Sequence, residues 1–108
     1  MTTQALQDHI LFQTGYLVNG IWKTLDTTFD VLNPATGEVI AKVAKAGKAQ
    51  TEEAIAAATK AFPAWRAKTA KERSAILYRW YELIIENKSW LGQLMTTEQG
   101  KPDRKSVV

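Results

Sequence analysis

Few side chains in this sequence are of the types that perform catalysis, and their spacing predicts no catalytic site. The 108 residues include one histidine, His9, and no cysteine. A zinc site of the usual kind needs three or four imidazole and thiolate ligands, and a Ser-His-Asp triad needs a histidine held in a fixed position. His9 lies near the N-terminus, where chains are often loosely held, so we interpret it as a surface residue. We therefore predict no metal ligand and no histidine-activated nucleophile.

The pair Gly100-Lys101 resembles part of a phosphate-binding loop but lacks the rest of the motif. A P-loop has a glycine five positions earlier and Ser or Thr after the lysine, and here those positions are Met95 and Pro102. The dinucleotide pattern Gly-x-Gly-x-x-Gly is also absent from the sequence. We interpret Gly100 as the C-cap of a helix that Pro102 prevents from continuing. The sequence therefore predicts no cofactor-binding residue.

The remaining candidates are carboxylates and aromatic rings, and both have structural interpretations. The glutamate pairs Glu52-Glu53 and Glu82/Glu86 have the spacing of solvated helix faces rather than of an acid/base pair. The tryptophans belong to apolar patterns, for which packing in a core is the expected role; they are Trp22, Trp65, Trp80 and Trp90. Nothing in these patterns predicts a reaction.

Turn signals indicate small antiparallel β structure over residues 16–43. Asn19-Gly20 lies between β-forming residues in "YLVNGIW", and both residues tolerate the positive φ that a type I′ hairpin requires. The later segment "FDVLNPATGEVIAKV" places proline and glycine in a turn. After this turn, Val39, Ala41 and Val43 alternate with Ile40 and Lys42, which is the two-residue period of a strand.

Helical patterns follow, and the sequence predicts three helices, at about 51–62, 70–86 and 88–99. Thr51 is the expected N-cap of the first helix, and Pro63 is expected to end it, because proline cannot donate and its ring clashes with the preceding turn. Thr69 and Glu72 form the pattern of a capping box at the start of the second helix. The order of strands and helices predicts an α/β fold. Apolar residues cover more than half the circumference of the 70–86 helix, so we expect an incomplete domain.

Composition excludes several classes of protein. Hydrophobic residues make up 45% and charged residues 23% of the chain, which is typical of a globular domain. The net charge is +3, but basic and acidic residues alternate along the chain, so no nucleic-acid partner is expected. No apolar run approaches the roughly 20 residues that span a bilayer. We expect no membrane partner, no secretory signal and a cytoplasmic location.

The order of these signals resembles the N-terminal region of the aldehyde dehydrogenase superfamily. The resemblance is continuous from about residue 16 to residue 102, and "NPATGE" and "TTEQGKP" are its most specific motifs. The segment "AWRAKTAKERSAILYRWYELI" is similar in wording to bacterial NAD(P)-dependent succinate-semialdehyde dehydrogenases. The resemblance implies the N-terminal part of a cofactor-binding domain in a parent enzyme that forms a homo-oligomer.

The resemblance also implies the chemistry of that parent enzyme. Such enzymes oxidise an aldehyde, here succinate semialdehyde, to the acid with NAD or NADP, and a cysteine thiolate is the nucleophile. The nucleophile, the general-base glutamate and the dinucleotide fold lie further along the family's chain, so no catalytic or cofactor residue is carried over. Some relatives bind a monovalent cation through carbonyls near the positions of Val31, Leu32 and Glu98, but we assign no metal here. We expect this chain alone to be inactive and to bind no cofactor.

The chain divides into three expected segments. Residues 1–15 are expected to be loose, residues 16–102 form the family region, and residues 103–108, "DRKSVV", depart from the family pattern. We expect the family region to be truncated after Pro102 and the last six residues to be a non-native tail. The alternative is a small non-enzymatic interaction module that presents the Trp80/Tyr81 helix face to a partner. Neither interpretation fixes the aldehyde, the choice between NAD and NADP, or the oligomeric state.

Overall fold

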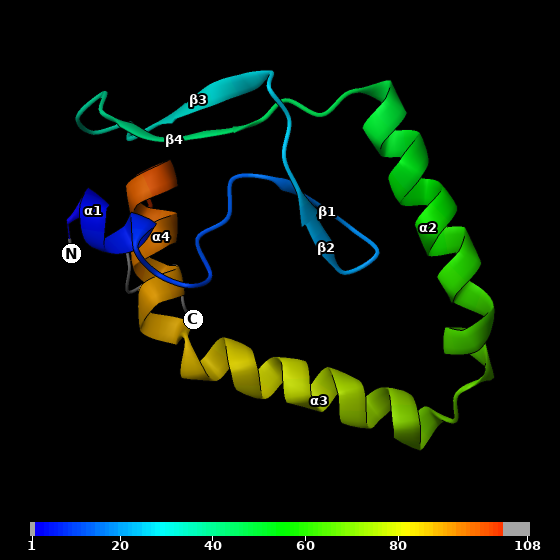
Figure 1. The fold of residues 1–108 in the computed structure, drawn as a ribbon. Helices are drawn as coiled ribbons and strands as arrows, with labels where there is room; N and C mark the ends of the chain where they lie inside the picture. Colours follow the sequence, from blue (N-terminus) through cyan, green and yellow to red (C-terminus); the bar gives the residue numbers. More distant parts are fainter. Residues whose placement is uncertain (1, 103–108) are drawn as a thin grey trace.

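A computed structural model describes residues 2–102, and the predicted non-native tail lies outside them. Two antiparallel two-stranded sheets and four helices occur in this range (Figure 1). In chain order the elements are α1 (Thr3–Gln7), β1 (Tyr16–Val18), β2 (Ile21–Lys23), β3 (Thr28–Leu32), β4 (Val39–Ala44), α2 (Lys48–Ala67), α3 (Ala70–Glu86) and α4 (Lys88–Gln99). The predicted order of hairpins followed by helices is confirmed.

The β1–β2 hairpin has the turn that its sequence predicts. Val18 pairs with Ile21 across the two strands, which leaves Asn19 and Gly20 as a two-residue loop. Their φ angles are 53° and 74°. Positive φ at both positions defines the type I′ geometry, whose twist matches that of the flanking strands.

The β3–β4 hairpin is closed by the polar turn of the NPATG segment. The Asn33 side chain accepts a hydrogen bond from the amide of Ala35 at 2.9 Å, and the Asn33 amide donates to the Glu38 carbonyl at 2.8 Å. Gly37 takes a φ of 75°, which a side chain would disfavour. Beyond the turn, Ile40 of β4 is only 2% exposed and belongs to the core.

Helix α2 is longer at both ends than the sequence predicts, and the prediction that Pro63 ends it is wrong. The helix begins after Gly47 rather than at Thr51, and it continues past Pro63 to Ala67. Alanine-rich sequence on both sides of the proline favours helix strongly enough to tolerate one missing donor. The end comes at Lys68, whose ψ of 148° is that of extended backbone.

Helix α3 begins with the predicted capping box. The Thr69 hydroxyl accepts from the Glu72 amide at 3.1 Å, and the Glu72 carboxylate accepts from the Thr69 amide at 3.0 Å. The hydrogen bond from the Thr69 amide, followed by the interaction with the Thr69 side chain, holds the pKa of the Glu72 carboxylate below its usual value. The bounds of α3 and α4 match the prediction.

The end of α4 also follows the sequence-based prediction. Gly100 takes a φ of 75° and its amide donates to the Thr96 carbonyl at 2.8 Å. Glycine is favoured at this left-handed C-cap because it has no side chain to clash. Gly100 is therefore a helix C-cap, as its position before Pro102 predicts.

A small core joins the N-terminal segment to β4 and α4. The buried apolar side chains of the described range are Leu6, Val18, Ile40 and Trp90. The Gln7 amide side chain donates to the Ile40 carbonyl at 2.6 Å, which ties α1 to β4. The helix α1 therefore packs against β4, and the division of the chain at residue 15 stays a prediction.

Helices α2 and α3 lie outside this core. They form a long bent frame around the β1–β2 hairpin, which lies on the inner side of the bend (Figure 1). Neither helix has a single buried residue. The shape is accordingly extended, with principal dimensions of 48 × 34 × 21 Å.

Removal of the α3 N-cap should destabilise that helix. Thr69→Ala leaves the Glu72 amide without its acceptor, and such substitutions cost about 1 kcal/mol. We expect less helix by far-ultraviolet circular dichroism and a lower melting temperature. Thr59→Ala, at an exposed position inside α2, is the control and should not destabilise. Equal melting of the two variants would contradict the role of the cap.

Acidification should weaken the same cap. Because the folded pKa of Glu72 is lowered, its contribution is present above the unfolded pKa and is lost as the pH falls through the folded pKa. Between about pH 6 and pH 3, the melting temperature of the native chain should fall more steeply than that of Glu72→Gln. Parallel curves for the two proteins would show that this carboxylate does not contribute.

Candidate functional site

The glutamates that the sequence offers as paired carboxylates lie on helix surfaces. Glu53 pairs with Lys23 of β2 and raises the pKa of that lysine, chiefly through their hydrogen bond. Glu86 lies 3.4 Å from Arg79. Exposed ion pairs of this kind contribute little to stability. Their positions support the structural interpretation over an acid/base pair.

His9 is held more firmly than its position near the N-terminus predicts. Its ring stacks on the indole of Trp90, with ring centroids 4.1 Å apart and planes 18° from parallel. Its Nδ1 accepts a hydrogen bond from the Leu11 amide at 3.1 Å. Within residues 2–102, no cluster of three His, Cys, Asp or Glu side chains is placed to hold a metal ion. His9 is therefore a packing residue between the N-terminal segment and α4.

The structure brings together two of the three positions near which some relatives hold a cation. Val31 of β3 and Glu98 of α4 line the same small pocket of about 190 Å³. The other lining residues are mainly apolar and include Ile40 and Leu94. Leu32 does not line this pocket.

The largest unexplained feature is the apolar surface of α3. Its large hydrophobic side chains are between 41% and 62% exposed, namely Ile76, Leu77, Tyr78, Trp80, Tyr81, Leu83, Ile84 and Ile85. A helix that is apolar on most of its surface is normally buried. The expectation that the tryptophans pack in a core holds for Trp90, but Trp22 and Trp80 are 50% and 62% exposed.

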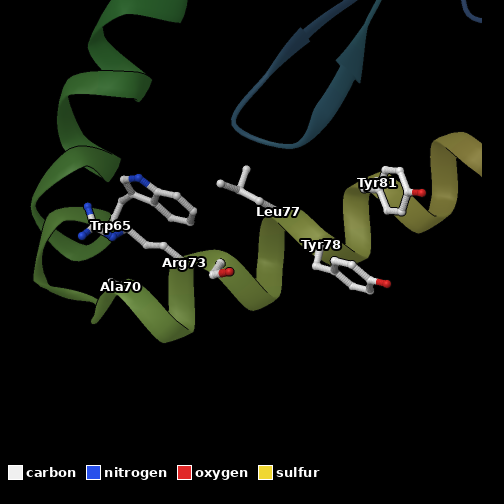
Figure 2. Close-up of a pocket in the computed structure, with 7 residues that line it drawn as sticks. Trp65, Ala70, Arg73, Leu77, Tyr78 and Tyr81 are labelled. Atoms are coloured by element: carbon white, nitrogen blue, oxygen red, sulfur yellow. The ribbon is translucent and has the colours of Figure 1, made fainter. Parts of the chain in front are cut away.

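The junction of α2 and α3 forms an open pocket, which we call the α2–α3 pocket (Figure 2). Its volume is about 630 Å³, and its lining is Trp65, Ala70, Arg73, Ser74, Leu77, Tyr78 and Tyr81. Extended backbone at Lys68 and Thr69 separates the two helices and sets the bend. Arg73, Leu77 and Tyr81 share one face of α3 because they are four residues apart.

The chemistry of the α2–α3 pocket is that of an interface. It presents aromatic and aliphatic surface with one cation, and its lining contains no histidine, cysteine or carboxylate that could activate Ser74. Sequence reasoning did not identify this pocket. The four-residue spacing of Arg73, Leu77 and Tyr81 is the signal that could have found their shared face. The facing position of Trp65 depends on the angle between two helices and has no local signal.

A search of the described helices for a membrane span finds none that combines the required length and apolarity.

Comparisons with known proteins identify the family. A sequence model described as "Aldehyde dehydrogenase family" matches residues 22–108. The glutarate-semialdehyde dehydrogenase of Pseudomonas putida KT2440 is 60% identical over 99 residues, which are 90% of this chain and 21% of that protein. The NADP(+) succinate-semialdehyde dehydrogenase of Escherichia coli K12 is 48% identical over 90% of this chain and 20% of its own length.

A solved structure has the same fold in this region. The crystal structure of succinate-semialdehyde dehydrogenase from Burkholderia pseudomallei superposes with a TM-score of 0.83 at 48% identity, over 89% of this chain and 20% of that one. This chain belongs to the aldehyde dehydrogenase family. It spans about a fifth of the length of the relatives that it matches.

The exposed surface of α3 should make the isolated chain associate. Complete burial of a large apolar side chain contributes about 1.5–3 kcal/mol, of which roughly half is forfeited at these exposures, so we expect dye binding, self-association in sedimentation and a broad melt. Replacing Trp80 and Ile84 together by serine should reduce dye binding and association. The control, Lys88→Ser on α4, should change neither. A monomer with a sharp melt above about 60 °C would contradict this account.

Proposed function

We propose that this chain is the N-terminal part of the cofactor-binding domain of an NAD- or NADP-dependent aldehyde dehydrogenase, and that the parent enzyme oxidises succinate semialdehyde to its acid. The supporting observation is the continuous similarity to semialdehyde dehydrogenases, with identities of 48% and 60% over 99 residues. The cytoplasmic location and the homo-oligomeric state of the parent stay predictions.

The role of this chain in that enzyme is structural. The sequence has no cysteine, so a thiolate nucleophile must come from another part of the parent. The described strands form two antiparallel pairs, whereas a dinucleotide site of the usual kind is built on parallel strands with a glycine-rich turn. Residues 2–102 therefore do not by themselves fit NAD or NADP. The exposed face of α3 is the part that the parent would cover.

Glutarate semialdehyde is the second candidate substrate. It is favoured by the higher identity to the Pseudomonas putida enzyme, 60% against 48% for the Escherichia coli enzyme. The two aldehydes differ by one methylene, which a pocket discriminates by only about 1–3 kcal/mol. Comparison of kcat/KM for the two aldehydes, each with NAD and with NADP, in the parent enzyme would decide both questions. Equal or greater use of glutarate semialdehyde would overturn the first assignment.

The structural role predicts an inactive isolated chain and an active chimera. The 108-residue chain should reduce neither NAD nor NADP in the presence of either aldehyde. A chimera in which residues 1–102 replace the matching region of the Pseudomonas putida enzyme should fold and oxidise glutarate semialdehyde. Aldehyde-dependent turnover by the isolated chain, or a chimera that does not fold, would contradict the proposal. The interaction-module alternative instead predicts a cooperative, monomeric isolated chain.

A further inference from the structure

We propose that Arg73 anchors the α2–α3 pocket to the remainder of the parent polypeptide, by pairing with a carboxylate that an apolar segment of that remainder brings into the pocket. The inference rests on the proposed function and adds to it the position and the chemistry of one contact. Neither the sequence motifs nor the family match assigns a role to Arg73.

The first observation is the unpaired charge of Arg73. Arg66 and Arg79 are exposed, whereas Arg73 is partly buried. Arg66 lies over the Phe62 ring at 5.8 Å, and Arg79 reaches Glu86. The guanidinium of Arg73 makes no hydrogen bond or ion pair with any other residue in the range 2–102. Arg73 lines an open pocket, and a segment that covered this pocket would withdraw the cation from water, so it would have to supply a partner to offset the cost of desolvation.

The second observation is the shape of the pocket around that charge. The Arg73 side chain extends from the first turns of α3 back toward Trp65 at the end of α2 (Figure 2). Leu77 and Tyr81 continue the same face of α3 and supply apolar surface beside the cation. This combination fits an apolar segment that carries one Asp or Glu. A carboxylate can accept two parallel hydrogen bonds from a guanidinium.

The third observation is that the acidic residues of α3 either have another partner or lie far from Arg73 along the helix. The carboxylate of Glu72 accepts from the Thr69 amide in the capping box, and Glu86 pairs with Arg79. Glu82 is nine residues beyond Arg73, about two and a half turns along the helix. The carboxyl end of α2 offers only a partial negative charge. The full negative charge must therefore come from outside the described residues.

The occupant that we assign is the remaining polypeptide of the parent enzyme. The matched relatives are about five times longer than the aligned region, because it covers only 20–21% of them. That length is ample to supply a segment that covers α3 and the α2–α3 pocket. A second copy of this chain is the competing occupant, and the experiment separates the two.

The test uses the chimera with the Pseudomonas putida enzyme. Arg73→Met keeps the aliphatic volume and removes the charge, and Arg79→Met is the matched control from the exposed side of the helix. We expect Arg73→Met to lower the melting temperature of the chimera by about 2 °C or more, with a smaller change for the control. In the isolated chain, where the carboxylate is missing, Arg73→Met should not lower the melting temperature.

A charge swap then identifies the partner. Arg73→Glu should destabilise the chimera, and replacement of one Asp or Glu in its Pseudomonas part by Arg should restore the melting temperature. This inference would be overturned if Arg73→Met and Arg79→Met lowered the melting temperature of an active chimera equally. It would also be overturned if the substitution that restores the melting temperature of Arg73→Glu lay within residues 1–102. Either result would leave the proposed function standing. If Arg73→Met lowered the melting temperature of the isolated chain as much as that of the chimera, the role of Arg73 would be an interaction with the α2 dipole. That result would also overturn the inference. An unsubstituted chimera that does not fold would contradict both proposals.

Discussion

Helix α3 carries apolar side chains around most of its surface, and the described residues leave this surface in water. Eight of its large side chains remain at least 41% exposed. Complete burial of such a side chain contributes about 1.5–3 kcal/mol, of which roughly half is not gained at these exposures, while the net stability of a domain is only about 5–15 kcal/mol. Caps and turns can start and end such a helix. They cannot bury its apolar side chains, so they do not make it part of a stable core.

The remainder of the chain shows how little cover is available. The small core under α1, β4 and α4 buries Leu6, Ile40 and Trp90, and His9 and Gln7 add a ring stack and a hydrogen bond. The β1–β2 hairpin approaches α2 and provides the ion pair between Lys23 and Glu53. Small chains bury a smaller fraction of their surface. A core of this size cannot also enclose two helices of 20 and 17 residues.

Local chemistry made part of this fold predictable from the sequence. The Asn19-Gly20 turn, the capping box of Thr69 and Glu72, and the C-cap at Gly100 each depend on neighbouring residues, so their motifs were sufficient. The continuation of α2 through Pro63 and the packing of residues 2–15 were not predicted. The first depends on a balance between helix propensity and one lost hydrogen bond, and the second depends on contacts with β4 and α4.

The α2–α3 pocket was harder to predict from sequence patterns than the caps and turns. Arg73 and Leu77 share a helix face by spacing, but Trp65 joins them only because Lys68 and Thr69 adopt extended backbone between α2 and α3. The sequence does not reveal that the Arg73 guanidinium lacks an ion pair within residues 2–102, because this depends on where Glu72 and Glu86 find their partners. The family could be recognised from the order of motifs, whereas the α2–α3 pocket depends on the angle between two helices.

Amide hydrogen exchange along the isolated chain tests most directly whether the helices α2 and α3 depend on cover from outside. Stability is expected to differ between regions, with the least-packed elements opening at the lowest free energy. The account predicts strong protection in β4 and α4 and much weaker protection throughout α3, despite its complete capping box. Protection of the α3 amides equal to that of α4, measured in monomeric protein, would show that the chain closes its own core and would contradict the account.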